Sequence, residues 1–213
     1  MKLYSYWRSS AAYRVRIAIN LKHIDCTLVP VNIAPDRNEN HLPEYTAKNP
    51  TGLVPTLELE DGTLLRQSLP IIEYLEKRHP ATPLLPNDDI ACANIMALAL
   101  DIGMEIHPLN NLRVINHLKQ HYNFSPNMSV EWMQHWIQTG FDAIENIIAD
   151  DDYCYGNSIT LADVFLMPQL YNALRWGINL TPYPRINRIH AHLSEHSAFI
   201  LAHPDNQSDA VII

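Results

Sequence analysis

The chain has 213 residues, 47% of them hydrophobic, and a formal net charge of −8 at pH 7. This length accommodates one large domain or two small ones with hydrophobic cores. The acidic balance argues against nucleic acid as a partner, because phosphate binding requires a basic surface. The sequence shows no bilayer-spanning apolar run, basic amphipathic stretch or signal peptide, so we expect no membrane association.

Three cysteines, Cys26, Cys92 and Cys154, are far apart and form no Cys-x-x-Cys pair. An odd number of isolated cysteines favours a reducing compartment. We therefore expect a soluble protein of the cytoplasm.

The amino-terminal part alternates strand and helix patterns. The sequence predicts a strand at 2–6, a helix from about Ser10 to Asn20 and a second strand at 27–32. Residues 34–50 are polar and proline-punctuated, which predicts a loop with at most a short helix. Strand-like segments then flank Asp61-Gly62, a hairpin signal, and Ser68 is expected to cap a helix that ends before Pro80. The predicted order is β-α-β, a variable connection, and β-β-α.

The rest of the chain reads as helical after a linker at 79–87 that contains three prolines. Apolar residues recur at helical spacing near four segments, namely 89–120, 129–150, 160–176 and 183–202. Thr160 and Asp163 have the spacing of a capping box, and we interpret the pair as structural rather than catalytic. We therefore predict an α/β plus all-α protein with domains at 1–80 and 88–213.

Three motifs in the first domain can carry chemistry. Ser9 and Ser10 open the first helix, where they can cap backbone N–H groups or present donors to an anion such as a thiolate. Val54 precedes a proline, and the bond is either an ordinary trans peptide or a cis peptide that exposes the Val54 backbone to an extended peptide. Gln67 and Ser68 can likewise cap a helix or hold an anion.

Two histidine pairs, His117 with His121 and His192 with His196, have a spacing of four residues. No carboxylate or cysteine at ligand spacing completes a metal site around them. We interpret them as solvated helix faces and expect no metal.

Together these features resemble the glutathione transferase superfamily, and its zeta class in particular. The motifs that carry the resemblance occur in order over nearly the whole chain, at residues 4–10, 14–18, 49–50, 54–56, 67–69 and 181–184. The resemblance implies a thioredoxin-like domain that binds glutathione, an all-helical second domain, and a homodimer.

The activity implied by the resemblance is glutathione-dependent cis–trans isomerisation of a diacid. Its substrate would be maleylacetoacetate, converted to fumarylacetoacetate in tyrosine and phenylalanine catabolism, with weak glutathione transferase activity besides. Maleylpyruvate isomerisation and a non-catalytic glutathione-binding protein are the alternatives. Genomic neighbours would separate the two isomerases, whereas the sequence does not.

The resemblance also assigns site residues position by position. It makes Ser9 the catalytic hydroxyl, aided by Ser10. The cofactor-binding residues that it implies are Ser9, Ser10, Ala11, Ala12, Tyr13, Arg14, Asn40, His41, Val54, Gln67, Ser68, His107, Asn111, Leu112 and Arg113. Arg8 and Arg175 are candidates for the two substrate carboxylates, because the guanidinium fork pairs with carboxylates in a bidentate way.

One residue departs from the class pattern. Ala11 stands where the class often has a cysteine. Alanine cannot form a mixed disulfide with glutathione, so we do not expect reductive dehalogenation. Isomerisation is unaffected, because its sulfur comes from glutathione.

Overall fold

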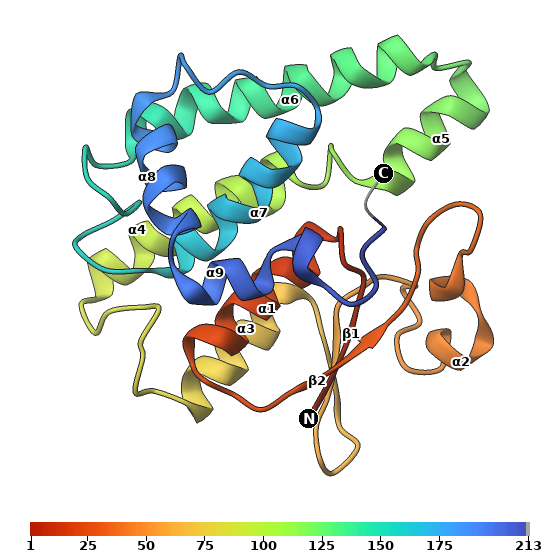
Figure 1. Cartoon of the computed structure of the whole chain (residues 1–213), viewed down its shortest axis with the longest axis horizontal. Helices are drawn as coiled ribbons and strands as arrows, with labels where there is room; N and C mark the ends of the chain where they lie inside the picture. Colours follow the sequence, from red (N-terminus) through yellow and green to blue (C-terminus); the bar gives the residue numbers. More distant parts are fainter. Residues whose placement is uncertain (212–213) are drawn as a thin grey trace. The chain divides into compact units, whose positions relative to one another are not determined.

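The computed structural model describes residues 1–211, which form two compact units. The first unit combines Met1–Pro83 with the residues from Glu195 onward, and the second is Leu84–Ser194. The sequence placed residues 195–213 in the helical domain instead. The structure assigns them to the first unit because α9 (Ser197–Ala202) packs against α1 (Ser10–Leu21), as Figure 1 shows.

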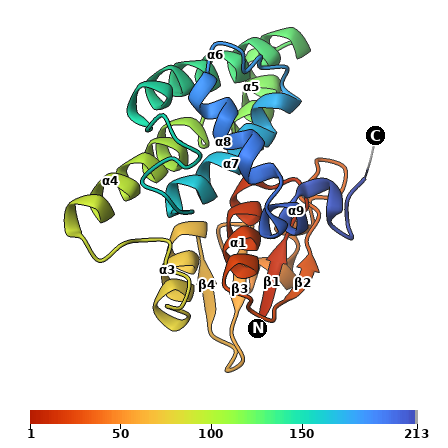
Figure 2. The same ribbon diagram turned by 60° about the vertical axis from the view of Figure 1, so that its left-hand side comes forward.

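A four-stranded mixed sheet forms the centre of the first unit, in the order β2-β1-β3-β4 (Figure 2). Its strands are β1 (Lys2–Ser5), β2 (Thr27–Pro30), β3 (Thr56–Glu58) and β4 (Leu64–Arg66). β1 is parallel to β2 and antiparallel to β3, and β3 pairs with β4 as the predicted hairpin. The predicted β-α-β and β-β-α order of a thioredoxin-like domain is confirmed.

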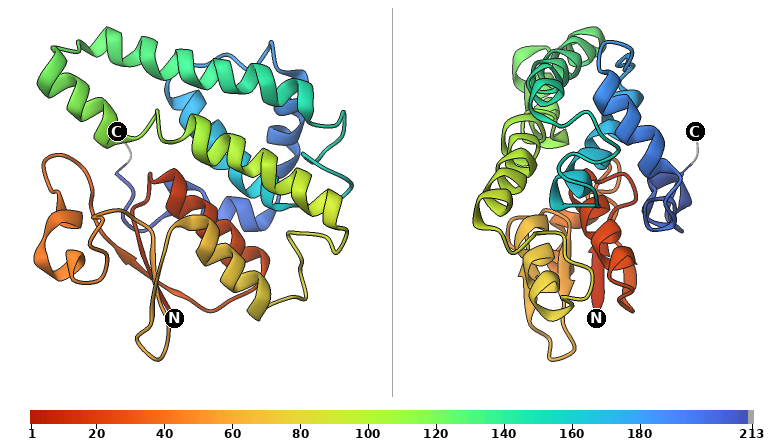
Figure 3. Two further views of the ribbon diagram at one scale, coloured as in Figure 1. Left: turned by 180° about the vertical axis from the view of Figure 1, so that it is seen from behind. Right: turned by 90° about the vertical axis from the view of Figure 1, so that its left-hand side faces the viewer.

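The helices of the first unit follow the predicted order with one correction. They are α1, α2 (Pro43–Thr46), α3 (Ser68–Arg78) and α9, with 3-10 turns at Glu39–His41 and Pro204–Asn206. α1 and α3 pack side by side (Figure 3). The expected cap at Ser68 is wrong: Gln67 occupies the N-cap position, and Ser68 is the first helical residue.

The second unit is helical, as predicted, but two of the predicted segments are interrupted. Its helices are α4 (Asp89–Leu100), α5 (Leu112–Tyr122), α6 (Pro126–Ile147), α7 (Leu161–Arg175) and α8 (Pro184–Ser194). The segment near 89–120 breaks after a π-helical turn, Asp101–Ile106, because Pro108 lacks a donor and Asn111 caps a new helix. The segment near 183–202 breaks where His196 caps α9.

The predicted capping box of α7 is confirmed. Asp163 Oδ2 accepts from Thr160 N at 2.7 Å and from Thr160 Oγ1 at 2.8 Å, and Asp163 Oδ1 accepts from Cys154 N at 2.8 Å. Burial raises the pKa of Asp163, although these hydrogen bonds act in the opposite direction. The carboxylate therefore fixes both the start of α7 and the loop before it.

α6 makes a close approach to the π-helical turn. A Cβ added at Gly140 would lie 2.2 Å from Ile106 Cδ1, so only glycine leaves room for this packing. Within residues 1–211, no helix has both the length and the apolar character needed to cross a bilayer.

Candidate functional site

Ser9 is the N-cap of α1, and its hydroxyl has two separate capacities. Its Oγ accepts a hydrogen bond from Ala12 N at 3.3 Å, so the oxygen satisfies one of the free donors of the helix. The hydroxyl proton remains available to donate to an anion. The first turn of α1 contains no acidic residue, so nothing there offsets the positive end of the helix dipole. Capping and anion binding are therefore compatible at Ser9.

The residues that follow Ser9 divide between surface and core. Ser10 and Ala11 are half-buried, whereas Ala12 and Tyr13 are 0% and 2% exposed. The side chains of Ala12 and Tyr13 belong to the core. Their backbone N–H groups donate to Ser9 Oγ and to Ser9 O, so neither of these two predicted site residues offers a free donor to an anion.

A turn before β3 offers unused backbone groups. The Val54–Pro55 bond is cis, the less common of the two alternatives that the sequence left open. Among the described residues, the N–H and C=O of Val54 have no hydrogen-bond partner. An extended peptide can pair with such groups as a short additional strand.

Three side chains hold that turn. Asn40 Nδ2 donates to Gly52 O at 2.7 Å. Tyr45 OH and Asn49 Nδ2 both donate to Leu53 O, at 2.6 and 2.7 Å. Sequence reasoning missed this role of Tyr45 and Asn49, although Asn49 stands in one of the recognised motifs. The carbonyls before Val54 are thus fixed by side chains, which leaves Val54 itself free for a ligand.

Asn40 and His41 occupy different environments. Asn40 is 7% exposed, and its Oδ1 is buried without a hydrogen-bond partner. His41 is exposed and lies over Gly52, where an added Cβ would be 2.9 Å from its Nδ1. The structure thus gives Asn40 a part in shaping the turn and places the ring of His41 at its surface.

The backbone is strained where β4 meets α3. Gln67 has φ of 68° and ψ of 134°, a left-handed region that a non-glycine residue rarely adopts. Such strain is concentrated at functional sites, where the surrounding structure maintains it. The side chain of Gln67 is exposed and makes no cap hydrogen bond, and the first turn of α3 contains no acidic residue. The side-chain amide of Gln67 and the N–H groups at the start of α3 are donors that suit a carboxylate.

Arg14 connects this point to α1. Its Nη1 donates to Ser68 Oγ at 3.5 Å, and both side chains are buried. Burial lowers the pKa of Arg14 to about 9, so the guanidinium stays charged at neutral pH. The structure thereby places a cation at the start of α3, and it brings the Ser9, Val54 and Gln67 segments into one unit.

Of the remaining predicted residues, one has a clear local role. Asn111 caps α5 by accepting from Arg113 N at 3.1 Å, and His107 follows the π-helical turn. Leu112 and Arg113 are exposed. These four belong to the second unit.

The two candidate arginines both lie on an indole ring. The guanidinium carbon of Arg8 lies 5.1 Å from the ring centroid of Trp7. Arg175 is exposed at the end of α7, 5.1 Å from the Trp176 ring, and donates to Asn172 Oδ1 at 3.0 Å. Stacking restricts both side chains, and the hydrogen bond to Asn172 restricts Arg175 further.

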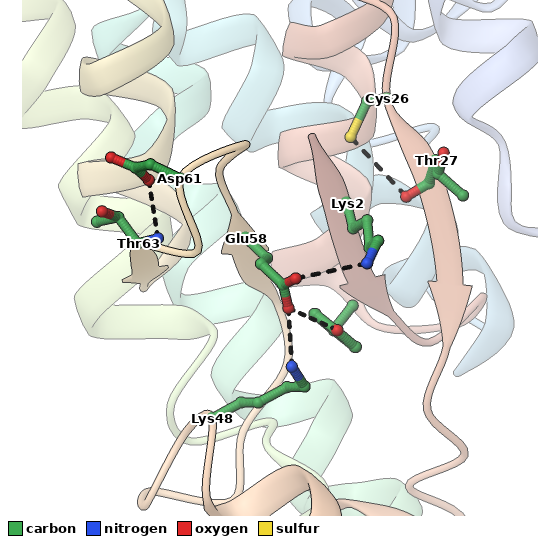
Figure 4. Close-up of polar contacts among 8 residues, drawn as sticks. Lys2, Cys26, Thr27, Lys48, Glu58, Asp61 and Thr63 are labelled. Carbon is green, nitrogen blue, oxygen red and sulfur yellow. Dashed lines mark hydrogen bonds and ion pairs between the residues drawn. The ribbon is translucent and has the colours of Figure 1, made fainter.

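A cluster of charged groups lies on the sheet. Glu58 Oε2 accepts from Lys48 Nζ at 2.8 Å and from Tyr4 OH at 2.7 Å, and Lys2 is 3.5 Å from Oε1 (Figure 4). Lys48 and Tyr4 lower the pKa of Glu58 to about 2. Within residues 1–211, no group of three or more potential metal ligands occurs, here or elsewhere.

Comparison with known proteins relates this geometry to a family. Residues 3–83 match the model described as the glutathione S-transferase N-terminal domain. A maleylacetoacetate isomerase of Pseudomonas aeruginosa is 45% identical over 209 residues, 98% of this chain and 98% of that protein.

Two solved structures are similar over the whole chain. The holo structure of a maleylpyruvate isomerase, a bacterial glutathione S-transferase in the zeta class, has a TM-score of 0.95 and 38% identity, covering 99% of this chain and 100% of that chain. A maleylacetoacetate isomerase of Methylobacterium extorquens AM1, with bound malonate and glutathione, has a TM-score of 0.95 and 34% identity, covering 100% of both chains.

The thioredoxin-like sheet, the helical second unit and the matching domain model define the glutathione transferase class. The identity with relatives over almost the full length narrows the assignment. The chain belongs to the zeta class of the glutathione transferases.

Proposed function

We propose that this protein is a glutathione-dependent cis–trans isomerase that converts maleylacetoacetate to fumarylacetoacetate. The observation that carries the proposal is Ser9, whose hydroxyl caps α1 through its oxygen and keeps its proton for a thiolate. The unpartnered backbone of Val54 and the strained Gln67 offer matching groups for the rest of the tripeptide. Relatives named for this isomerisation support the choice of reaction.

The residues of the first unit fit glutathione group by group. Val54 would pair with the cysteinyl backbone, and Gln67 with Ser68 would hold the γ-glutamyl carboxylate. Asn40 and His41 would contact the glycine end of glutathione. Arg14 contributes positive charge behind Ser68. His107, Asn111, Leu112 and Arg113 are proposed as further contacts from the resemblance alone.

Ser9 and the start of α1 are sufficient to hold the sulfur as an anion. A free thiol has a pKa near 8.5, and lowering it by about two units requires roughly 2.7 kcal/mol. A hydrogen bond to a charged acceptor contributes about 1.5–3 kcal/mol, and a helix terminus adds roughly 0.3–2 kcal/mol. Ser9 acts as a donor, because a serine hydroxyl is too weak a base to remove the proton.

When bound, glutathione would supply a nucleophilic sulfur whose reversible addition to the cis double bond permits rotation and release of the trans isomer. Ser10 and the N–H groups of the first turn would offset negative charge that develops on the substrate oxygen. Arg8 and Arg175 are proposed to bind the two substrate carboxylates. Each residue thus binds, orients or stabilises charge, and none needs to be a general base.

Maleylpyruvate isomerisation is the second candidate, since a structure of similar fold carries that name. Comparing kcat/KM for the two diacids at saturating glutathione separates them. A higher value for maleylacetoacetate supports the proposal, and a higher value for maleylpyruvate replaces it with the second candidate. A protein that binds glutathione and converts neither diacid would be the non-catalytic alternative.

We further propose a cytoplasmic homodimer with weak transferase activity. The three cysteines are free, which suits a reducing compartment. Ile90 of α4 and Met104 of the π-helical turn are 74% and 62% exposed, and a partner subunit would cover such apolar side chains.

A further inference from the structure

Charged side chains hold both ends of Trp7, two residues before Ser9. Trp7 N donates to Asp209 Oδ2 at 3.0 Å, and Trp7 O accepts from Arg16 Nη2 at 2.9 Å. Hydrogen bonds with an ionised partner are roughly twice as strong as neutral ones. The carboxylate of Asp209 and the guanidinium of Arg16 therefore fix the loop between β1 and α1.

Arg16 joins this loop to α9. Its Nη1 donates to Ser5 Oγ at 3.0 Å and to Tyr6 O at 3.4 Å, and its Nε donates to Ala202 O at 3.1 Å. The side chain is 2% exposed, and the rigid fork of five donors is suited to several carbonyls at once. Arg16 thus fixes the end of β1 relative to the last turn of α9.

Asp209 comes from the segment that follows α9, which packs on the same loop. Ala210 lies against the apolar cluster that contains Trp7 and Val54. Gln207 Nε2 donates to Leu201 O at 2.9 Å and to His203 O at 2.8 Å, which ties this segment to α9. The carboxy-terminal segment therefore contacts both the loop before Ser9 and the apolar cluster to which Val54 belongs.

The position of Ser9 depends on this arrangement. Ser9 N donates to Tyr6 O at 3.0 Å, so one turn joins the cap residue to the peptides that Arg16 and Asp209 hold. We propose that Asp209, together with Arg16, is a positioning residue that sets the Ser9 hydroxyl for the glutathione sulfur. This inference rests on the proposed function. Misplacement by about 1 Å can cost a factor of about 100 in rate, so a loosened loop has measurable consequences.

The experiment compares Asp209→Ala, Asp209→Asn and the control Asp205→Asn in the full chain. Asp205 lies in the same segment and is exposed, so its replacement changes the charge by the same amount without touching Trp7. One arm uses no ligand and measures hydrogen–deuterium exchange of the Trp7 amide. The other arm measures the pKa of bound glutathione from thiolate absorbance, with the glutathione Kd from calorimetry and kcat/KM for the diacid.

We expect Asp209→Ala to speed exchange of the Trp7 amide at least about tenfold, because the acceptor is lost. We also expect it to raise the pKa of the bound thiol by about one unit, to lower kcat/KM about tenfold, and to change Kd less than about threefold. Asp209→Asn keeps an acceptor oxygen and should recover most of both effects. Asp205→Asn should match the parent protein.

Two results would overturn the inference. Unchanged exchange in folded Asp209→Ala would show that the contact does not order the loop. Faster exchange with an unchanged thiol pKa and kcat/KM would show that the contact is structural alone. If the parent protein neither binds glutathione nor lowers its thiol pKa, the proposed function fails and the positioning role fails with it, whereas the exchange arm still judges the contact.

Discussion

At the scale of single residues, Ser9 caps a helix and is also the proposed donor to the glutathione sulfur. Its oxygen accepts from Ala12 N, and its proton is left for a ligand. The sequence alone left capping and anion binding open, because both use a serine at the start of a helix. The structure shows the cap, which uses the oxygen as acceptor and leaves the two roles compatible.

Replacing Ser9 by alanine should therefore have two separable effects. Losing a hydrogen bond of about 1.5–3 kcal/mol to a charged acceptor should raise the pKa of bound glutathione by about one to two units, and lower kcat/KM about 10- to 100-fold. Loss of the cap should lower the free energy of unfolding by about 1 kcal/mol. Thiolate absorbance against pH measures the first effect and urea unfolding the second.

Ser9→Thr is the matched variant, since it keeps the hydroxyl and the cap. A titration of bound thiol that is unchanged in Ser9→Ala would transfer the role to Ser10 or to the backbone of α1.

Arg175→Ala should raise KM for the diacid about tenfold or more, because a charge-assisted contact to a carboxylate is lost. Activity toward an aryl halide such as chlorodinitrobenzene should stay nearly constant, since that substrate has no carboxylate. Arg188→Ala is the control, because Arg188 is an arginine of the same unit paired with Asp150. Equal losses on both substrates would disprove carboxylate binding by Arg175.

How far the sequence predicts the site depends on the distance along the chain between interacting residues. Ser9, Val54 and Gln67 are recognisable because each stands at a local boundary of a helix or strand. Arg16 and Asp209 are not recognisable, because their partners become neighbours only after folding, and Asp209 lies 202 positions from Trp7. Arg14 is likewise buried although its helical position gave no such indication.

At the scale of elements, the start of α7 relies on one carboxylate. Asp163→Ala should lower the free energy of unfolding by about 3 kcal/mol, because the N–H groups of Cys154 and Thr160 would be left buried without an acceptor. Urea unfolding measures the change. Glu131→Ala, on the exposed surface of α6, should stay within about 0.5 kcal/mol of the parent. If Asp163→Ala lowered the free energy of unfolding by less than about 1 kcal/mol, the structural role assigned to Asp163 would be contradicted.

The stability that the Glu58 cluster gives to β3 and its neighbours should depend on pH. The pKa of Glu58 falls from 4.5 to about 2 on folding, through Lys48 first and Tyr4 second. A carboxylate whose pKa is lower in the folded than in the unfolded chain stabilises the fold at pH values above the unfolded-state pKa. This contribution to stability is lost as pH falls from about 4.5 to about 2.

Urea midpoints measured across that range test the prediction. Glu58→Gln should lose part of the acid dependence, and Lys48→Gln should narrow the pH window by raising the pKa of Glu58. An acid dependence of Glu58→Gln identical to that of the parent would show that the cluster contributes nothing.

Element boundaries were predicted where a local signal exists. The hairpin at Asp61-Gly62 and the capping box at Thr160 and Asp163 follow from short motifs, and both are present. The cap of α3 was misassigned because Gln67 adopts a positive φ that no propensity indicates. The break before α5 was missed because apolar spacing continues across Pro108.

At the scale of the whole molecule, the carboxy-terminal segment belongs to the first unit rather than to the helical one. Asn20 Nδ2 donates to Ala198 O at 3.0 Å and Arg16 Nε donates to Ala202 O, so α9 is held by polar side chains of α1. Composition along the chain cannot reveal this return, because α9 has the same helical character as the residues before it.

The proposed homodimer would show in light scattering as twice the 24.4 kDa chain mass.

The most direct test of the account is a rate measurement with and without the thiol. Conversion of maleylacetoacetate by the purified protein should proceed with glutathione and be absent with S-methylglutathione, which offers the same peptide contacts but no ionisable sulfur. Equal conversion with either compound would contradict the thiolate mechanism. No conversion with glutathione at saturating concentration would contradict the proposed isomerase itself.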